Sequence, residues 1–282
     1  IGDFNMTKTK WYFINSGKQS GSYNMALDEC LIKWQSEEGF LPTLRFYEWE
    51  NPTVTIGYFQ KNQEISLEAL KRYNGDFVRR QTGGRSVLHH DELTYSVIVP
   101  ENYPNMPETV TEAYRVISMG ILEGYKLLGL DASFSVPKTS EEKDELKKPA
   151  SAVCFDAPSW YEVVVNDKKI AGSAQTRQKG SILQHGSIPL NIDVDMLYDL
   201  YIFSSEAVKE KMKKRFLDRA TWINAESATP KTMDDLYKAF KEGFEIGLNI
   251  ELVPYELTEE QEKEVQELVA TKYSTEEWNL RK

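Results

Sequence analysis

The chain of 282 residues is poor in the residue types that most often build metal sites, since it has two cysteines and three histidines. Two cysteines, Cys30 and Cys154, are too few for a disulfide scaffold and exclude a four-thiolate zinc site. With so few histidines, no metal site and no cofactor are expected. Both thiols are therefore expected to be free, as in a reducing cytoplasm.

Long apolar runs and an excess of positive charge are also missing. No run approaches the roughly 18–20 apolar residues of a membrane span, and no signal-peptide pattern opens the chain. Met6 is expected to be the natural start, with residues 1–5 a remnant ahead of it. The formal net charge of −10 argues against general nucleic-acid binding, which needs a basic face. We therefore expect a cytoplasmic protein whose partners are neither nucleic acid nor membrane.

The apolar residues, 40% of the chain, are arranged in a mixture of helical and strand periods. Helices are predicted at 22–37, 66–73, 110–128, 194–203, 206–216, 233–248 and 259–271, and strands at 11–15, 44–50, 53–59, 77–80, 93–99, 160–165, 169–174 and 181–189. This pattern predicts an α+β fold: a mixed, largely antiparallel sheet flanked by helices. We expect a single domain over 1–282, with residues 192–282 as a mostly helical C-terminal portion.

Three local features refine this prediction. Ser22 is a plausible N-cap for the first helix. Asn51 and Pro52 are expected to turn between two paired strands. Residues 139–150, which are rich in Lys, Glu and Pro, are interpreted as a mobile, solvated loop.

The most informative segment runs from Arg79 to Ser96 and contains a glycine turn, Thr82-Gly83-Gly84-Arg85. Glycines bring backbone N–H groups close to a ligand. The turn lacks the Gly-Lys-Ser/Thr ending of a P-loop and is not G-x-G-x-x-G. Strand alternation places Arg79 and Arg80 on opposite sides, so one is expected to face a pocket and the other solvent. An ordinary hairpin turn is the alternative.

A second segment, from Cys154 to Gln175, combines a thiol with a lysine fifteen residues on. Cys154 follows a polar loop and precedes Asp156, so it does not lie in an apolar run. Lys169 begins a strand of small residues that leave room for a ligand. Cys30, by contrast, lies on the core face of a helix. A nucleophile and a cation that activates it suggest acyl transfer through a thioester.

Both segments resemble the biotin/lipoate protein ligase superfamily and, more narrowly, the LipM-type octanoyltransferases of Gram-positive bacteria. The matching stretches are SYNMALDE, RRQTGGRSVLH, DELTYS, CFDAPSWYE, KKIAGSAQTRQ, LQHGSIPL and EEWN, which span nearly the whole chain. The chain departs from the adenylating ligases at Arg85, where they commonly carry a third glycine, and we expect no accessory C-terminal domain of the ligase type. Both departures speak against ATP use.

The resemblance implies a function and a set of site residues. Octanoate would move from octanoyl-acyl carrier protein to a lysine of the glycine cleavage system H protein, the first step of protein lipoylation. Cys154 would be the acyl-accepting nucleophile, and Lys169 would contact the acyl carbonyl. The substrate-binding residues would be Arg80, Thr82, Gly83, Gly84, Arg85, His89, Gly172, Ser173, Ala174 and His185.

Three alternatives remain open at this point. The first is an amidotransferase that moves octanoyl or lipoyl groups from H protein to the lipoyl domains of E2 subunits, also through cysteine. The second is an ATP-dependent lipoate ligase. The third is a binding module for lipoyl domains or acyl carriers that has no catalytic activity.

Overall fold

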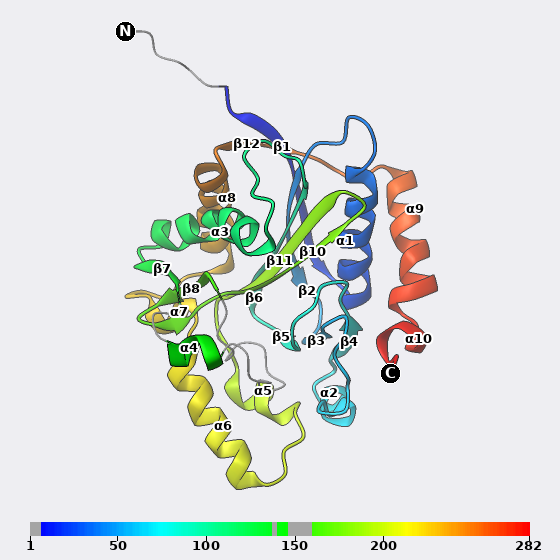
Figure 1. Cartoon of the computed structure of the whole chain (residues 1–282). Coiled ribbons are helices and arrows are strands. Elements are labelled where there is room, and N and C mark those ends of the chain that lie inside the picture. The colour runs from blue at the N-terminus through cyan, green and yellow to red at the C-terminus, as the bar shows by residue number, and fades with distance from the viewer. Residues whose placement is uncertain (1–6, 137–139, 146–159) are drawn as a thin grey trace.

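The computed structural model describes residues 7–136, 140–145 and 160–282. Its centre is a six-stranded sheet of order β10-β11-β6-β2-β1-β12 (Figure 1). The strands are β1 (Thr9–Gln19), β2 (Thr43–Trp49), β6 (Glu92–Pro100), β10 (Gly172–Gln178), β11 (Ser181–Pro189) and β12 (Ile250–Pro254). The pairs from β10 to β2 are antiparallel, whereas β2, β1 and β12 are parallel neighbours. The expected mixed α+β architecture is confirmed.

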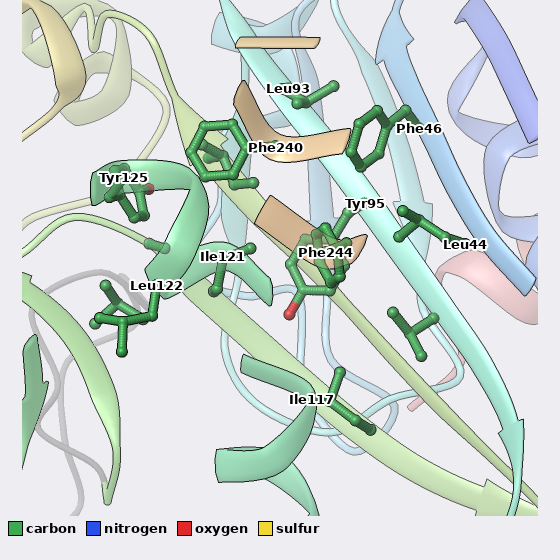
Figure 2. Packing of buried hydrophobic residues seen from close by; sticks show 14 of the residues in the cluster. Leu44, Phe46, Leu93, Tyr95, Ile117, Ile121, Leu122, Tyr125, Phe240 and Phe244 are labelled. Carbon is green, nitrogen blue, oxygen red and sulfur yellow. The ribbon is translucent and has the colours of Figure 1, made fainter. Parts of the chain in front are cut away.

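Helices cover both faces of this sheet. One face carries α3 (Val110–Leu127) and α8 (Met233–Leu248), which pack on each other and on Phe46 and Tyr95 (Figure 2). The other face carries α1 (Gly21–Gln35), and α9 (Glu259–Leu268) packs on α1. Strand alternation divides the core between the two faces, because Phe46 belongs to the first cluster and its neighbour Tyr47 to the second.

Small residues let α3 and α8 approach closely. A Cβ on Gly124 would lie 2.2 Å from the Phe240 ring, and one on Gly243 would lie 2.4 Å from the Gly124 nitrogen. Four aromatic and aliphatic side chains, Ile117, Ile121, Phe240 and Phe244, fill the space beside these glycines.

Two three-stranded sheets flank the large one. The first has the order β4-β3-β5 and comprises β3 (Thr53–Ile56), β4 (Asp76–Arg79) and β5 (Val87–His89). The second has the order β7-β8-β9 and comprises β7 (Ala132–Ser135), β8 (Glu162–Val165) and β9 (Lys168–Lys169). The glycine turn joins β4 to β5, and Lys169 ends β9.

The remaining helices lie at the periphery: α2 (Leu67–Arg72), α4 (Ser140–Glu145), α5 (Val194–Asp199), α6 (Glu206–Arg219), α7 (Ile223–Glu226) and α10 (Glu276–Asn279), with a π-turn at Val269–Tyr273. Within the described ranges, no helix has the length and apolar character needed to cross a membrane.

Several local predictions are corrected. The strands on either side of Asn51 and Pro52 do not pair, because β2 joins the large sheet and β3 a small one. The N-cap of α1 is Ser20 rather than Ser22, whose hydroxyl donates to the Tyr273 carbonyl instead. Residues 140–145 of the expected loop are helical, while the rest of it lies outside the described residues. The strand predicted at 169–174 is divided between β9 and β10.

Candidate active site

A cavity lies where the large sheet meets the β4-β3-β5 sheet. Seven of the residues expected to bind substrate line it: Arg80, Gly84, His89, Gly172, Ser173, Ala174 and His185. The rest of its lining, not foreseen from the sequence, is Met25, Tyr47, Trp49, Thr55, Val87, Thr94, Gly186 and Ser187. The alternation of Tyr47 and Trp49 along β2 was the available signal, since both side chains face the same side of that strand.

The other three expected residues, Thr82, Gly83 and Arg85, belong to the glycine turn but do not line the cavity. Thr82 is fully buried beneath the turn. Gly84 has a φ of +91°, a conformation that favours glycine. The turn lies tightly against the end of β3, because a Cβ on Gly57 would be 1.9 Å from the Gly84 carbonyl oxygen.

Arg80 holds the turn from below. Its Nη2 donates to the carbonyl oxygens of Gly83 at 2.8 Å and Arg85 at 2.9 Å. Its Nη1 donates to the carbonyl and hydroxyl oxygens of Thr55, and its Nε to the Thr82 hydroxyl. These five hydrogen bonds match the five donors of a guanidinium group. Arg80 therefore shapes the turn through protein acceptors.

The peptide between Gly83 and Gly84 is oriented by this contact. Its carbonyl points at Arg80, and in a trans peptide the N–H of Gly84 then points the opposite way. In the part of the chain that the structure describes, neither glycine N–H donates a hydrogen bond. The turn thus offers backbone donors to a ligand oxygen.

Arg79 does not meet solvent, which corrects the expectation for one of the two arginines. Both side chains are buried. The Arg79 guanidinium donates to the carbonyls of the loop after β3 and of the C-terminal segment: Gly57, Tyr58, Gln60, Trp278, Asn279 and Arg281. It ties the end of the chain to the loop that supports the glycine turn.

His185, on β11, is buried between two polar partners. Its Nδ1 lies 2.9 Å from Asp28 Oδ2 and its Nε2 lies 2.6 Å from the Thr82 hydroxyl. Burial lowers the pKa of His185, although the hydrogen bond to Asp28 opposes this. Burial raises the pKa of Asp28, but the hydrogen bond with His185 and the charge of Arg45 bring it below its usual value. The pair is therefore a neutral imidazole beside a carboxylate.

His89, at the end of β5, has a matching environment. Its Nδ1 lies 3.0 Å from Glu92 Oε2, and its Nε2 lies 2.8 Å from the Thr55 hydroxyl. Its ring stacks on Trp49 with the centroids 4.2 Å apart. Trp49 is held in place by a hydrogen bond to Thr94.

The strand β10 forms one wall of the cavity with small residues. Ser173 Oγ lies 2.6 Å from the Tyr95 hydroxyl. Gly186 of β11 pairs with Ser173, and a Cβ on Gly186 would lie 2.4 Å from Ser173 Oγ. A larger residue at Gly186 would displace this wall.

Lys169 is buried but is not part of the cavity lining. Its Nζ lies 3.3 Å from Glu162 Oε1, and its carbonyl accepts from the N–H of Thr221. Three residues further on, the chain enters β10 at Gly172, which does line the cavity. Lys168 points the other way, as expected, and donates to the Leu217 carbonyl.

One of the two cysteines, Cys30, lies among the described residues. Cys30 is buried in α1, and burial raises the pKa of its thiol to about 12, so it fits the structural role expected for it. Cys154 lies outside the described residues. Among the described residues, no group of three or more His, Cys, Asp or Glu side chains is arranged to hold a metal ion.

Comparison with known proteins places this site in a family. Residues 20–245 match the model of the lipoyl protein ligase A/B catalytic domain. The chain belongs to this family. Octanoyltransferase LipM of Bacillus anthracis is 61% identical over 98% of this chain and 100% of its own length. Octanoyltransferase LipM of Bacillus subtilis is 57% identical over the same shares.

Solved structures of the family share the fold. A bipartite lipoate protein ligase from Thermoplasma acidophilum superimposes with a TM-score of 0.79 at 26% identity, covering 96% of each chain. A lipoate-protein ligase A bound with ATP has a TM-score of 0.74 at 25% identity, covering 97% of this chain and 98% of that one.

Membership of the lipoyl protein ligase family confirms two expectations from the sequence. The resemblance to LipM-type octanoyltransferases is confirmed, and with it the assignment of the chain as an acyltransferase. The glycine turn and the strand of small residues, which carried the resemblance, lie together on one cavity.

Proposed function

We propose that this acyltransferase moves an octanoyl group from octanoyl-acyl carrier protein to a lysine of the glycine cleavage system H protein, through a thioester on Cys154. The observation that carries the proposal is the cavity bounded by Gly84 on one side and by Gly172, Ser173 and Ala174 on the other. The LipM relatives, which match over their full length, support octanoyl as the acyl group.

The largely apolar cavity supplies affinity for the acyl chain. Each buried methylene contributes about 0.8 kcal/mol. An acyl chain shorter by two methylenes would therefore bind more weakly by about 1.6 kcal/mol, or roughly 15-fold. Met25, Tyr47 and Trp49 stand at the wall formed by α1 and β2.

The first chemical step is acylation of the enzyme. The Cys154 thiolate attacks the carbonyl carbon of the donor thioester, a new carbon–sulfur bond forms, and the carrier leaves as its own thiolate. We assign Lys169 as the cation that stabilises the thiolate and the oxyanion. We assign the N–H of Gly84 as the second oxyanion donor. The carbonyl of the same peptide, that of Gly83, is turned toward Arg80, so the N–H points the other way.

The second step transfers the acyl group to the acceptor. The neutral amine of the acceptor lysine attacks the carbonyl carbon of the octanoyl-cysteine, and a carbon–nitrogen bond forms. The carbon–sulfur bond breaks, and Cys154 leaves as a thiolate that takes up the proton lost by the amine. An amide replaces a thioester, so the step is downhill. The thioester donor is already activated, so the reaction requires no nucleotide.

Intact mass spectrometry after mixing the protein with octanoyl-carrier protein tests this function. The expected result is a gain of one octanoyl group in the unchanged protein and none in Cys154→Ser. Cys30→Ser is the matched control and should be acylated as the unchanged protein is, because the Cys30 thiol is buried. Acylation that persists in Cys154→Ser would refute the thioester.

An amidotransferase would also acylate Cys154 but from a different donor. Incubation with octanoyl-carrier protein and, separately, with octanoyl-H protein distinguishes the two. Acyl-enzyme formed only from octanoyl-H protein would replace the proposed donor.

An ATP-dependent ligase is the second candidate, favoured by the fold shared with the ATP-bound lipoate-protein ligase A. Such an enzyme would require nucleotide and would keep its activity in Cys154→Ser. A binding module without catalytic activity would bind the acyl carrier and the acceptor protein. Neither the unchanged protein nor Cys154→Ser would then show turnover.

A further inference from the structure

Two threonines link Arg80 to the two buried histidines. The Thr82 hydroxyl lies 3.2 Å from Arg80 Nε and 2.6 Å from His185 Nε2. The Thr55 hydroxyl lies 2.9 Å from Arg80 Nη1 and 2.8 Å from His89 Nε2. Each histidine then contacts a carboxylate through Nδ1. The site therefore contains two parallel relays of carboxylate, imidazole and hydroxyl that converge on one guanidinium.

The protonation of the first relay follows from its donors and acceptors. An ionised Asp28 only accepts, so His185 Nδ1 carries the proton and donates it. In a neutral ring Nε2 then accepts, and the Thr82 hydroxyl is its donor. The Thr82 oxygen keeps a lone pair for Arg80. Every hydrogen bond in the relay is satisfied in this one arrangement.

The second relay has the same contacts, since His89 Nδ1 lies 3.0 Å from Glu92 Oε2 and its Nε2 lies 2.8 Å from the Thr55 hydroxyl. Glu92 also accepts from the Thr94 hydroxyl at 2.6 Å. Two relays built from different strands thus reach the same arrangement.

The network already contains buried positive charge. Arg45 donates to Asp28 at 2.9 Å, and the Arg80 guanidinium donates to both threonine hydroxyls. A proton on either imidazole would add a buried positive charge near Arg80 and would turn Nε2 into a donor facing a hydroxyl that must then find another acceptor.

We propose that Asp28 with His185, and Glu92 with His89, are positioning residues: through Thr82 and Thr55 they fix Arg80, and Arg80 holds the glycine turn in the orientation that leaves the Gly84 N–H open to the acyl oxygen. The relays do not touch the acyl group themselves. This inference rests on the proposed function, in which that N–H stabilises the oxyanion.

The imidazole signals test the arrangement directly, because the chain has only three histidines. In ¹H–¹⁵N spectra at neutral pH, His185 should be a neutral ring protonated at Nδ1. His90, which is exposed, serves as the reference and is assigned from His90→Asn. A His185 ring that is protonated at Nε2, or charged at neutral pH, would overturn the proposal.

Single-turnover acylation of Cys154 tests the consequence. Thr82→Val keeps the shape but leaves Arg80 Nε without an acceptor and His185 Nε2 without a donor. It should lower the acylation rate about 5- to 150-fold, the range typical of an unsatisfied buried polar group. Thr82→Ser keeps the hydroxyl and should restore most of that rate. Thr43→Val removes a buried hydroxyl that donates only to the Leu41 carbonyl, and should leave the rate unchanged.

Two further results separate the possible failures. If the unchanged protein forms no acyl-enzyme, the proposed function fails, whatever the spectra show. If it does form one, and Thr82→Val acylates as fast as Thr82→Ser, the positioning role is refuted. Thr55→Val and Thr55→Ser repeat the comparison on the second relay if Thr82→Val does not fold.

Discussion

The carbonyl oxygen of Gly84 lies so close to Gly57 that a Cβ on Gly57 would be 1.9 Å from it. The clash would be with backbone, so no side-chain rotation relieves it. The end of β3 and the glycine turn are therefore in contact along their main chains, and residue 57 sets where the turn lies.

Gly57→Ala should displace the turn and slow acylation of Cys154 by about 100-fold, since a shift near 1 Å is enough to cost that much. The free energy of unfolding should also fall, by about 1–3 kcal/mol. Gly124→Ala, which overlaps the Phe240 ring far from the turn, is the control. It should lower stability but leave the acylation rate of the folded protein intact, measured by mass spectrometry and urea unfolding.

Lys169→Met should reduce the acylation rate by about 100- to 1000-fold, because it removes the cation assigned to the oxyanion. Lys168→Met is the matched control on the same strand. In the described part of the chain its Nζ donates only to the Leu217 carbonyl, so single-turnover rates should not change. Equal rates in the two variants would remove the role assigned to Lys169.

The stability of the protein should decrease as the pH falls below about 6.5. His185 has a pKa below this ordinary value in the folded state, so below pH 6.5 the unfolded chain binds a proton that the folded chain does not. The free energy of unfolding should then fall by up to about 1.4 kcal/mol per pH unit, until the pH reaches the folded pKa.

Urea unfolding from pH 7.5 to 5 measures this dependence. The slope should weaken in His185→Asn and persist in His90→Asn, which alters an exposed ring. If the slope disappears in His90→Asn instead, His185 is not the group that causes the pH dependence, and the prediction is wrong.

Arg79→Lys should destabilise the protein by about 2–4 kcal/mol, because an ammonium cannot reach the carbonyls on both sides of the guanidinium. Arg72→Lys, on the exposed face of α2, should change the free energy of unfolding by less than about 0.5 kcal/mol. Limited proteolysis should show earlier cleavage near Trp278 in Arg79→Lys, since the C-terminal segment loses its anchor.

The helix α6 tests the proposed carrier partner. It has an excess of basic residues in an acidic protein. The chain after its C-terminal end reaches Thr221, whose N–H donates a hydrogen bond to the Lys169 carbonyl. Lys211→Glu with Lys214→Glu should raise the KM for an acidic octanoyl-carrier protein and leave that for a small octanoyl thioester unchanged. Lys238→Glu with Lys263→Glu changes the net charge equally and should have neither effect.

Much of the local structure could be predicted from the sequence. The sequence correctly placed Cys30 on the core face of a helix, because Cys30 is buried in α1. Asn166 and Asp167, between β8 and β9, have the positive φ values that Asn and Asp tolerate. These features depend on neighbours within a few residues, whose preferences the sequence states directly.

The sequence by itself determined the α+β class and the segments that meet at the cavity, because hydrophobic period and turn chemistry are local properties. Only the tertiary structure decided that β2 and β3 join different sheets, that Arg79 is buried against the C-terminal segment, and that Asp28 lies against His185, 157 residues away. A buried polar group takes whichever partner the packing of distant elements brings within hydrogen-bond distance, and no short-range pattern records that choice.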